Sequence, residues 1–227
     1  MLSKDLSLDT GEKMEEREQY LKATAIIDCG HKTIEEKANQ VTKGQKGVIE
    51  KAISLFHFVR DGIRYNPHLP RYLPEHFRAS NTLARGEGFC VQKSVLLVAL
   101  SRTVGIPARL RFAIIRNDLL QGKVAELLNT NILPDHGYTE LYLNGKWVKA
   151  TAVFDLEMCQ KNRFIPVEFD GINDAKFHSH TKDGKSHIEY LLDRGPYEDV
   201  PVNEIREWLL PVLKPEGKRR ILGEDPL

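Results

Sequence analysis

The sequence has few cysteines, no long apolar run and almost no excess of either charge. Three cysteines, an odd number in 227 residues, do not form a disulfide framework. The longest unbroken apolar run, Val95 to Leu100, is far too short to cross a bilayer, and the charged N-terminus lacks the apolar stretch of a secretory signal. A net charge of +1 gives no reason to expect nucleic acid or membrane as partner. We therefore expect a protein of the reducing cytoplasm, with free thiols.

Repeats, low-complexity segments and convincing linkers are also lacking. A hydrophobic content of 41% and a charged content of 29% are typical of an ordinary globular protein. The length suits one domain with a substantial core. We predict a flexible segment over residues 1–19, a single domain over 20–213 and a charged, frayed tail over 214–227.

Hydrophobic periodicity and turn residues predict most of the elements. The spacing of apolar residues changes from helical to alternating after Pro107, which indicates helices first and an antiparallel sheet afterwards. Helices are expected over 33–41, over 47–65, from residue 90 to about 104, and near 203–209. Strands are expected over 108–114, 138–143 and 146–151, and a strand or a short extended segment over 20–27. A further hairpin is expected over 177–181 and 186–191 around Asp183-Gly184.

Cys90 is the first candidate for chemistry. Gly86 and Gly88 precede it, and the nearly all-apolar run that follows predicts a buried helix, ended by Gly105 and Pro107. A thiol at the start of a helix faces unpaired N–H groups and the positive end of the helix dipole, which lower its pKa. Cys90 is therefore a candidate nucleophile. The alternative is a cysteine that only packs in the core.

A predicted hairpin supplies the second candidate, His136. Asn144-Gly145 is the pair most favoured in a two-residue hairpin turn, so the register of its arms can be extended outward. This register sets His136 opposite Val153, on the same face as Thr151 and Asp155. A thiol nucleophile needs a base, and the base needs an orienting group. Cys90, His136 and an acid on the paired strand meet these needs in chain order.

Two motifs in this region resemble those of the transglutaminase-like superfamily, of bacterial or archaeal type. Gly88-Phe89-Cys90 with the segment to Arg109 is similar to its core motif, and the segment from His136 to Val148 is similar to its histidine motif. The resemblance covers about residues 20–155. It implies an α+β, papain-like fold, in which a nucleophile helix packs on an antiparallel sheet. It also implies an acyl-enzyme formed by Cys90, with His136 as general base and acid.

The third catalytic residue departs from the family pattern. The family usually places an aspartate four residues after the motif tryptophan, and this chain has Thr151 there. Asp155 lies on the same predicted face and is our preferred candidate, because a buried carboxylate is the usual orienting group. Thr151 is the alternative, since it accepts a hydrogen bond but carries no charge. For the oxyanion, the backbone N–H of Cys90 is one expected donor, with Gln92 or Asn81 as the second.

No metal and no cofactor are expected. His178, His180 and His187 would share a face of the second predicted hairpin, and zinc binding there is the weaker alternative. The sequence thus predicts a cysteine-dependent enzyme that cleaves or transfers acyl groups at amide or peptide bonds. Its substrate is expected to be a protein, a peptide or a small amide. A catalytically inactive binding module with the same fold is the second hypothesis, motivated by Thr151.

Overall fold

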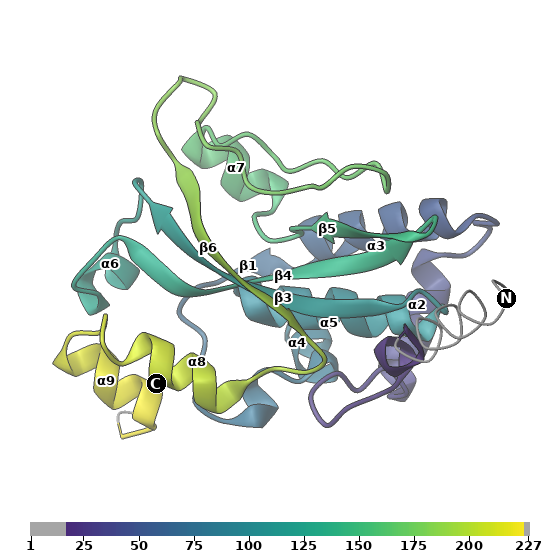
Figure 1. The fold of residues 1–227 in the computed structure, drawn as a ribbon, viewed down its shortest axis with the longest axis horizontal. Helices are drawn as coiled ribbons and strands as arrows, with labels where there is room; N and C mark the ends of the chain where they lie inside the picture. Colours follow the sequence, from purple (N-terminus) through teal and green to yellow (C-terminus); the bar gives the residue numbers. More distant parts are fainter. Residues whose placement is uncertain (1–16, 225–227) are drawn as a thin grey trace, which may run out of the picture.

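The computed structural model describes residues 17–224 and is organised around a four-stranded antiparallel sheet (Figure 1). The strands run in the order β5-β4-β3-β6. A separate two-stranded parallel pair joins β1 to β2. The strands are β1 (Arg64–Tyr65), β2 (Glu87–Gly88), β3 (Ala108–Asn117), β4 (Ile132–Leu143), β5 (Lys146–Ala150) and β6 (Ile188–Tyr197).

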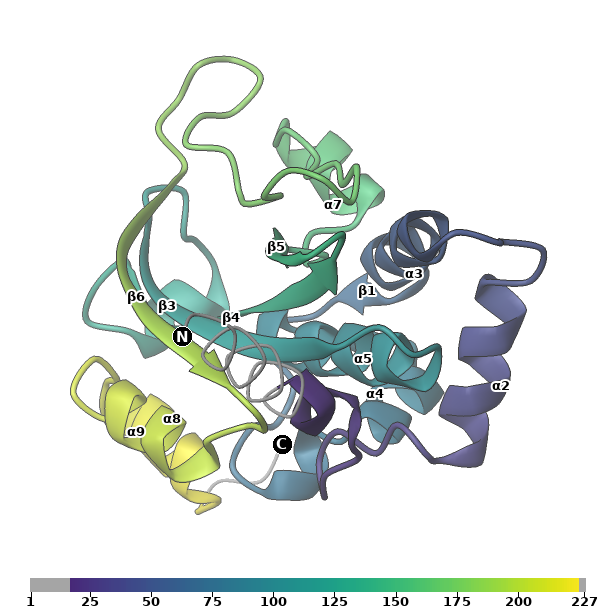
Figure 2. The same ribbon diagram turned by 45° about the vertical axis from the view of Figure 1, so that its right-hand side comes forward.

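Helices α2 to α5 gather on one side of this sheet, and α8 and α9 lie together near its β6 edge (Figure 2). Among them α5 packs directly against β3 and β4. The helical elements are η1 (Gln19–Leu21), α2 (Lys32–Val41), α3 (Val48–Gly62), η2 (Pro74–His76), α4 (Ala79–Arg85), α5 (Cys90–Thr103), α6 (Lys123–Leu127), α7 (Leu156–Asn162), α8 (Val202–Leu209) and α9 (Pro215–Leu222). The predicted α+β fold, with its nucleophile helix on an antiparallel sheet, is confirmed.

Helix α5 begins at Cys90, as the sequence predicts. Its residues from Val91 to Arg102 are all buried, so this is a core helix surrounded on every side. It is followed by Gly105 at φ +80°, a backbone conformation that favours glycine. The run of apolar residues and the glycine therefore predicted both ends of the helix on physical grounds.

The hairpin of β4 and β5 forms with the predicted turn and register. Asn144 and Gly145 both have positive φ, and Tyr142 pairs with Trp147. The pairing ends at Thr139 and Ala150, because the N–H of Thr151 donates to Ala175 instead of continuing along β4. The extension of this register to His136 and Val153 is therefore wrong.

The pairing of β3 with β4 and with β6 is irregular near the candidate residues. Between the pairs Ala113–His136 and Ile115–Leu133, strand β4 carries one more residue than β3, which is a β-bulge. Pro134 lies within it, and a proline is tolerated there because it has no N–H to donate to the ladder. Strand β6 is likewise irregular twice, on either side of the two pairs Ala113–Asp193 and Ile114–Leu192.

Other expectations on the flanks are corrected. The second hairpin does not form as predicted: β6 pairs with β3, and only a single bridge joins His180 to Ser186. The stretch from Lys214, expected to be frayed, folds as α9, with Gly217 and Ile221 buried. Residues 20–27 form no strand, and 19–21 are a short 3-10 helix. The flexible segment predicted over 1–19 lies largely outside the described residues.

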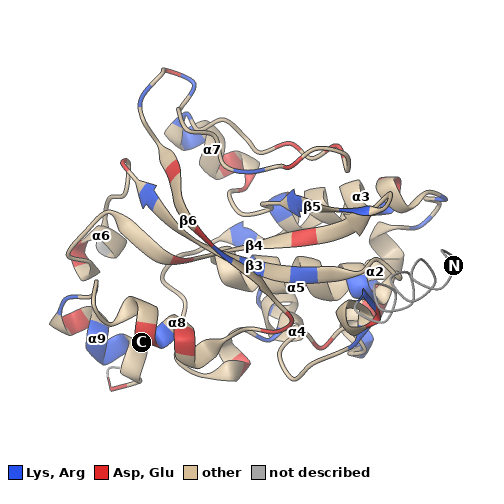
Figure 3. Ribbon diagram, viewed as in Figure 1, with Lys and Arg blue, Asp and Glu red and all other residues tan. Residues whose placement is uncertain are grey.

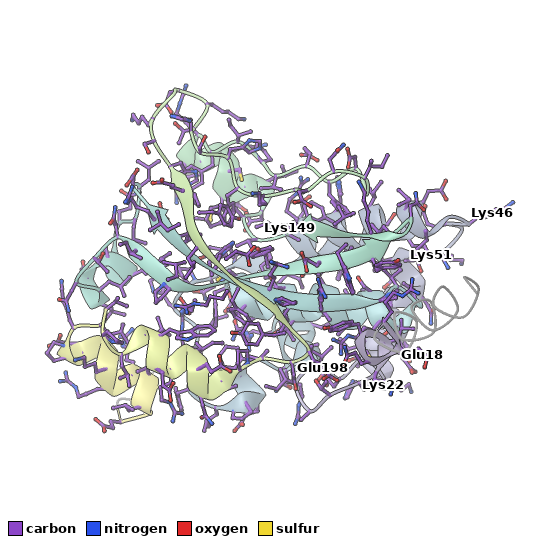
Figure 4. All side chains as sticks on the ribbon, viewed as in Figure 1. Glu18, Lys22, Lys46, Lys51, Lys149 and Glu198 are labelled. Carbon is purple, nitrogen blue, oxygen red and sulfur yellow. The ribbon has the colours of Figure 1, made fainter. Side chains whose placement is uncertain are left out.

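Charges of both signs are interspersed over the elements (Figure 3). Lys46 extends from the loop between α2 and α3, away from the sheet (Figure 4). Over the described range 17–224, no helix combines the length and the apolar character that crossing a membrane requires. The cellular location stays a prediction.

Candidate active site

Cys90 is half-buried at the first position of α5. Burial and the nearby carboxylate of Asp135 raise the pKa of its thiol to about 11. The backbone N–H groups of Gly137 and Val91 lie close enough to favour the thiolate, but they do not offset the burial. The expected lowering by the start of the helix is therefore wrong as a net effect. At neutral pH the group is a thiol.

Gly137 allows α5 to approach β4 closely. A Cβ at this position would lie 3.1 Å from the Cα of Val91 and 3.0 Å from its side chain. The strand and the first turn of the helix are thus in backbone contact, which brings the residue next to His136 to the sulfur of Cys90. Because adjacent backbone positions are fixed, this packing brings the candidate nucleophile and the candidate base to one region.

His136 lies on β4 and is almost fully buried, with 2% of its surface exposed. Burial lowers the pKa of its imidazole to about 3, so the ring is neutral at physiological pH. It stacks on Tyr138 with a centroid distance of 5.7 Å, as expected for two residues on one strand face. Its Nε2 atom lies 3.3 Å from the hydroxyl of Tyr190 on β6.

Cys90 and His136 line the same cavity, which has a volume of about 150 Å³. Aromatic and aliphatic side chains make up most of its wall, and many of them come from the loops that follow β1, β3, β5 and α7. Tyr65 and Asp135 also line it, and burial raises the pKa of the Tyr65 phenol above its ordinary value. The cavity thus places a neutral thiol, a neutral imidazole and a neutral phenol around a mostly apolar space.

Asp155, the preferred third residue, is engaged elsewhere in this structure. One carboxylate oxygen accepts from the N–H of Met158 and caps α7, and the other accepts from the N–H of Tyr65, both at 2.8 Å. No hydrogen bond of the described residues joins it to His136. Thr151 is fully buried, and its hydroxyl makes no hydrogen bond of regular geometry within the described range. It does lie close enough to Tyr190 to favour the phenolate.

The side chains expected to complete an oxyanion site also have other partners. Gln92 accepts from the N–H of Phe89 and donates to the carbonyl of His76 at 2.7 Å, which ties the start of α5 to the preceding loop. Asn81 is exposed on α4 and donates to the carbonyl of Glu75. Neither belongs to the cavity wall. The role of the backbone N–H of Cys90 as an oxyanion donor stays a prediction.

A family model of the transglutaminase-like superfamily matches residues 35–152, more than half of the chain. The chain belongs to the transglutaminase-like superfamily. This confirms the family that the cysteine and histidine motifs indicated. The matched segment ends before the third candidate residue Asp155 and before β6, so it includes Cys90 and His136 but not Tyr190.

Three solved structures are similar to this transglutaminase-like chain at low identity. A candidate cysteine protease from Cytophaga hutchinsonii is 18% identical, with a TM-score of 0.45 over 59% of this chain and 40% of that one. A candidate protease from Parabacteroides distasonis is 16% identical, with a TM-score of 0.39 over 53% and 23%. The periplasmic domain of TgpA from Pseudomonas aeruginosa is 16% identical, with a TM-score of 0.41 over 60% and 46%. The chain thus spans less than half of the length of each. No curated protein matches it.

Sequence reasoning missed the polar groups that approach the transglutaminase-like site from outside the two motifs. Tyr190 reaches His136 only because β6 pairs with β3 through two irregularities, which no short-range pattern reveals. Asp135 directly precedes His136, and strict alternation would place it on the opposite face. The proline at position 134 was the one signal available, since it marks the bulge that lets both neighbours line the cavity.

The three histidines of the weaker zinc alternative, His178, His180 and His187, differ in their surroundings. His187 is buried and stacks on Phe164 with a centroid distance of 4.0 Å, whereas His178 and His180 are exposed. Burial lowers the pKa of His187 to about 4. Within residues 17–224, no group of three or more histidine, cysteine or acidic side chains is arranged to hold a metal ion.

Proposed function

We propose that this chain is a cysteine-dependent enzyme acting on amide or peptide bonds, with Cys90 as the nucleophile and His136 as the general base and acid. The observation that carries the proposal is that these two residues line one cavity, while Gly137, the neighbour of His136, packs against the first turn of α5. Membership of the transglutaminase-like superfamily supports it. Proteins, peptides and small amides are the substrate class.

The reaction begins from a neutral pair. Because the pKa of Cys90 is raised to about 11 and that of His136 lowered to about 3, a separate thiolate and imidazolium are not populated at rest. The thiol proton therefore passes to His136 as the sulfur attacks the carbonyl carbon. The backbone N–H of Cys90 donates to the developing oxyanion. His136 then returns the proton to the leaving nitrogen, the C–N bond breaks, and an acyl-enzyme remains.

Tyr190 takes the place of the missing acid in this scheme. Its hydroxyl contacts Nε2 of His136 at 3.3 Å, and burial raises its pKa, so the phenol stays neutral. We assign the imidazole proton to Nε2, donating to the phenol oxygen, because Nδ1 then keeps the lone pair that a base needs. Asp155 stays our sequence prediction for this role, and its two backbone partners favour Tyr190 over it.

Water or an amine resolves the acyl-enzyme. Water is the default acceptor unless the site excludes it, so we favour hydrolysis over acyl transfer. His136 removes a proton from the acceptor, the C–S bond breaks, and the thiol is regenerated. Incubation of a peptide mixture with and without a primary amine distinguishes the two reactions. The transfer product is heavier than the acid formed by hydrolysis by the mass of the amine less one water.

Mass spectrometry of the intact protein tests the proposal. The native chain is expected to accumulate an acyl adduct on Cys90 and to cleave peptides. Cys90→Ala should lose at least 1,000-fold of the activity, as nucleophile removal does elsewhere. Cys29→Ala removes a buried thiol away from the cavity and is the matched control. An unmodified Cys90 and equal activity in both variants would refute the proposal.

Binding without turnover is the second candidate, and one observation favours it. No carboxylate among the described residues forms a hydrogen bond with His136, and the pKa values of the pair oppose charge separation. A binding module would hold peptides with equal affinity before and after Cys90→Ala and would release no product. The same incubation therefore distinguishes the two functions.

A further inference from the structure

A second cavity adjoins the cavity of Cys90 and has a volume of about 100 Å³. The two cavities share Pro67, Arg71, Val124, Leu133 and Asp135. The rest of the second wall comes from the loop over residues 68–72, from the end of α6, and from α8, α9 and the turn between them. Its aliphatic residues are Leu69, Leu127, Leu128, Leu209, Leu213 and Ile221.

This volume limits what the cavity can hold. An apolar cavity of about 150 Å³ holds benzene, so one of 100 Å³ suits an aliphatic side chain such as leucine but not an indole ring. Helices α8 and α9 lie beyond the segment 35–152 that matches the family model. The second cavity is therefore completed by a part of the chain that is outside the matched family core.

Asp135 lies on the boundary between the two cavities. It is 4% exposed, and its Oδ2 lies 3.5 Å from Nη1 of Arg71. This oxygen nevertheless accepts no hydrogen bond within the part of the chain that the structure describes. A buried acceptor without a donor is unfavourable, because it has lost the hydrogen bond that water gives it in the unfolded chain. The bulge in β4 directs this carboxylate toward the cavities, where a donor on a ligand can reach it.

We propose that the second cavity is a binding subsite for an aliphatic side chain of a peptide substrate, with Asp135 accepting the backbone N–H of the same residue. The inference rests on the proposed function and names its substrate class. A peptide residue carries an N–H and a side chain on the same Cα, so the unpaired oxygen and the aliphatic wall are satisfied together. The positive charge of Arg71 already compensates the negative charge of Asp135. A neutral amide donor therefore suits the site better than an ammonium group.

Binding to Cys90→Ala tests the subsite without any turnover. The probes are N-acetyl-leucine N-methylamide and its alanine analogue, titrated by NMR. The leucine compound buries about three more carbon atoms, and at roughly 0.8 kcal/mol for each it should bind at least tenfold more tightly. Equal affinities for leucine and alanine would overturn the proposal. If the wild-type protein cleaves no peptide, the proposed function is refuted, but the preference for leucine over alanine can still be measured.

A second probe isolates Asp135. Methylation of the leucine nitrogen removes the N–H, and should weaken binding about tenfold in a protein that is otherwise unchanged. In Asp135→Leu, which keeps roughly the size of the side chain but has no acceptor, the methylated and unmethylated compounds should differ by less than threefold. An effect of methylation that is equal in both proteins would exclude Asp135 as the acceptor.

A third probe tests whether the cavity instead recognises the free carboxylate of a chain end. Arg220 also lines the second cavity, and its guanidinium would attract a free carboxylate. N-acetyl-leucine with its free carboxylate should bind no more tightly than the capped amide. Tighter binding of the free acid would mean that the cavity recognises a chain end and would overturn the assignment of an internal peptide residue.

Discussion

The two faces of the central sheet position the candidate catalytic residues in different ways. On the α5 face, Gly137 brings strand and helix into backbone contact, and aliphatic side chains fill the interface. On the opposite face, His136 is surrounded by the rings of Tyr138, Phe177 and Tyr190, brought in from β4, β6 and the long connection before β6. The nucleophile therefore depends on tight local packing, and the base depends on contacts between distant segments. Changes on the first face should lower stability, and changes on the second should lower activity.

Lys93 offers the largest expected effect on the α5 face. It is fully buried on α5, and its Nζ donates to the carbonyls of Arg60 and Ile63 at 2.9 and 2.5 Å, where α3 ends. Lys93→Met leaves both carbonyls without this donor, so the free energy of unfolding should fall by about 3 kcal/mol. Urea unfolding followed by circular dichroism measures it. Lys46→Met, on an exposed loop, is the control, and a loss under 1 kcal/mol at position 93 would contradict the prediction.

The same lysine gives the stability a pH dependence. Burial lowers its pKa to about 7, against about 10.4 for an unfolded lysine. Between these values the unfolded chain binds the proton and the folded chain does not, so stability increases with pH by up to about 1.4 kcal/mol per unit. Unfolding free energies at pH 7 to 10 should rise more steeply for the native chain than for Lys93→Met. Parallel curves would show that Lys93 keeps its proton when buried.

Gly137→Ala challenges the contact of β4 with α5 directly. The new Cβ would lie 3.1 Å from the Cα of Val91, a backbone atom that cannot rotate away. Overpacking of this kind typically costs 1–3 kcal/mol, and we expect about 2 kcal/mol by urea unfolding. The displaced helix should also reduce peptide cleavage. Gly30→Ala, where a Cβ would meet nothing within 4 Å, is the control. Unchanged stability would mean that the two backbones separate freely.

The difference between the faces also explains what the sequence could predict. Periodicity and turn residues predicted α5 and the turn at Asn144-Gly145, since both depend on residues close together in the chain. They could not predict that Thr151 leaves β5 to bond Ala175, or that β6 brings Tyr190 to His136. Those contacts join distant segments through bulges, and a register shift of one residue reverses which side chains share a face. The extrapolation from Tyr138 to Asp155 failed for this reason.

Tyr190→Phe tests the aromatic face. The ring remains, but the hydroxyl on Nε2 of His136 is lost, so the imidazole is less well oriented. We expect kcat for a cleaved peptide to fall about tenfold, equivalent to about 1.4 kcal/mol, with KM nearly unchanged. The control is Tyr197→Phe, on the same strand as Tyr190. It removes a hydroxyl that donates to Glu204 of α8. An unchanged kcat in Tyr190→Phe would show that the Tyr190 hydroxyl does not orient His136.

Asp155→Asn tests whether Asp155 acts as a helix cap or orients His136. Its expected effect is the smallest. An asparagine still caps α7 through one oxygen, but its amide N–H₂ would face the N–H of Tyr65, which the carboxylate now accepts. We expect a loss of about 1 kcal/mol in the free energy of unfolding, with kcat within twofold of the native value. If Asp155 instead oriented His136, kcat would fall about 10,000-fold, as when a triad aspartate becomes asparagine. Because these outcomes differ by three orders of magnitude or more, a steady-state assay separates a helix cap from a catalytic acid.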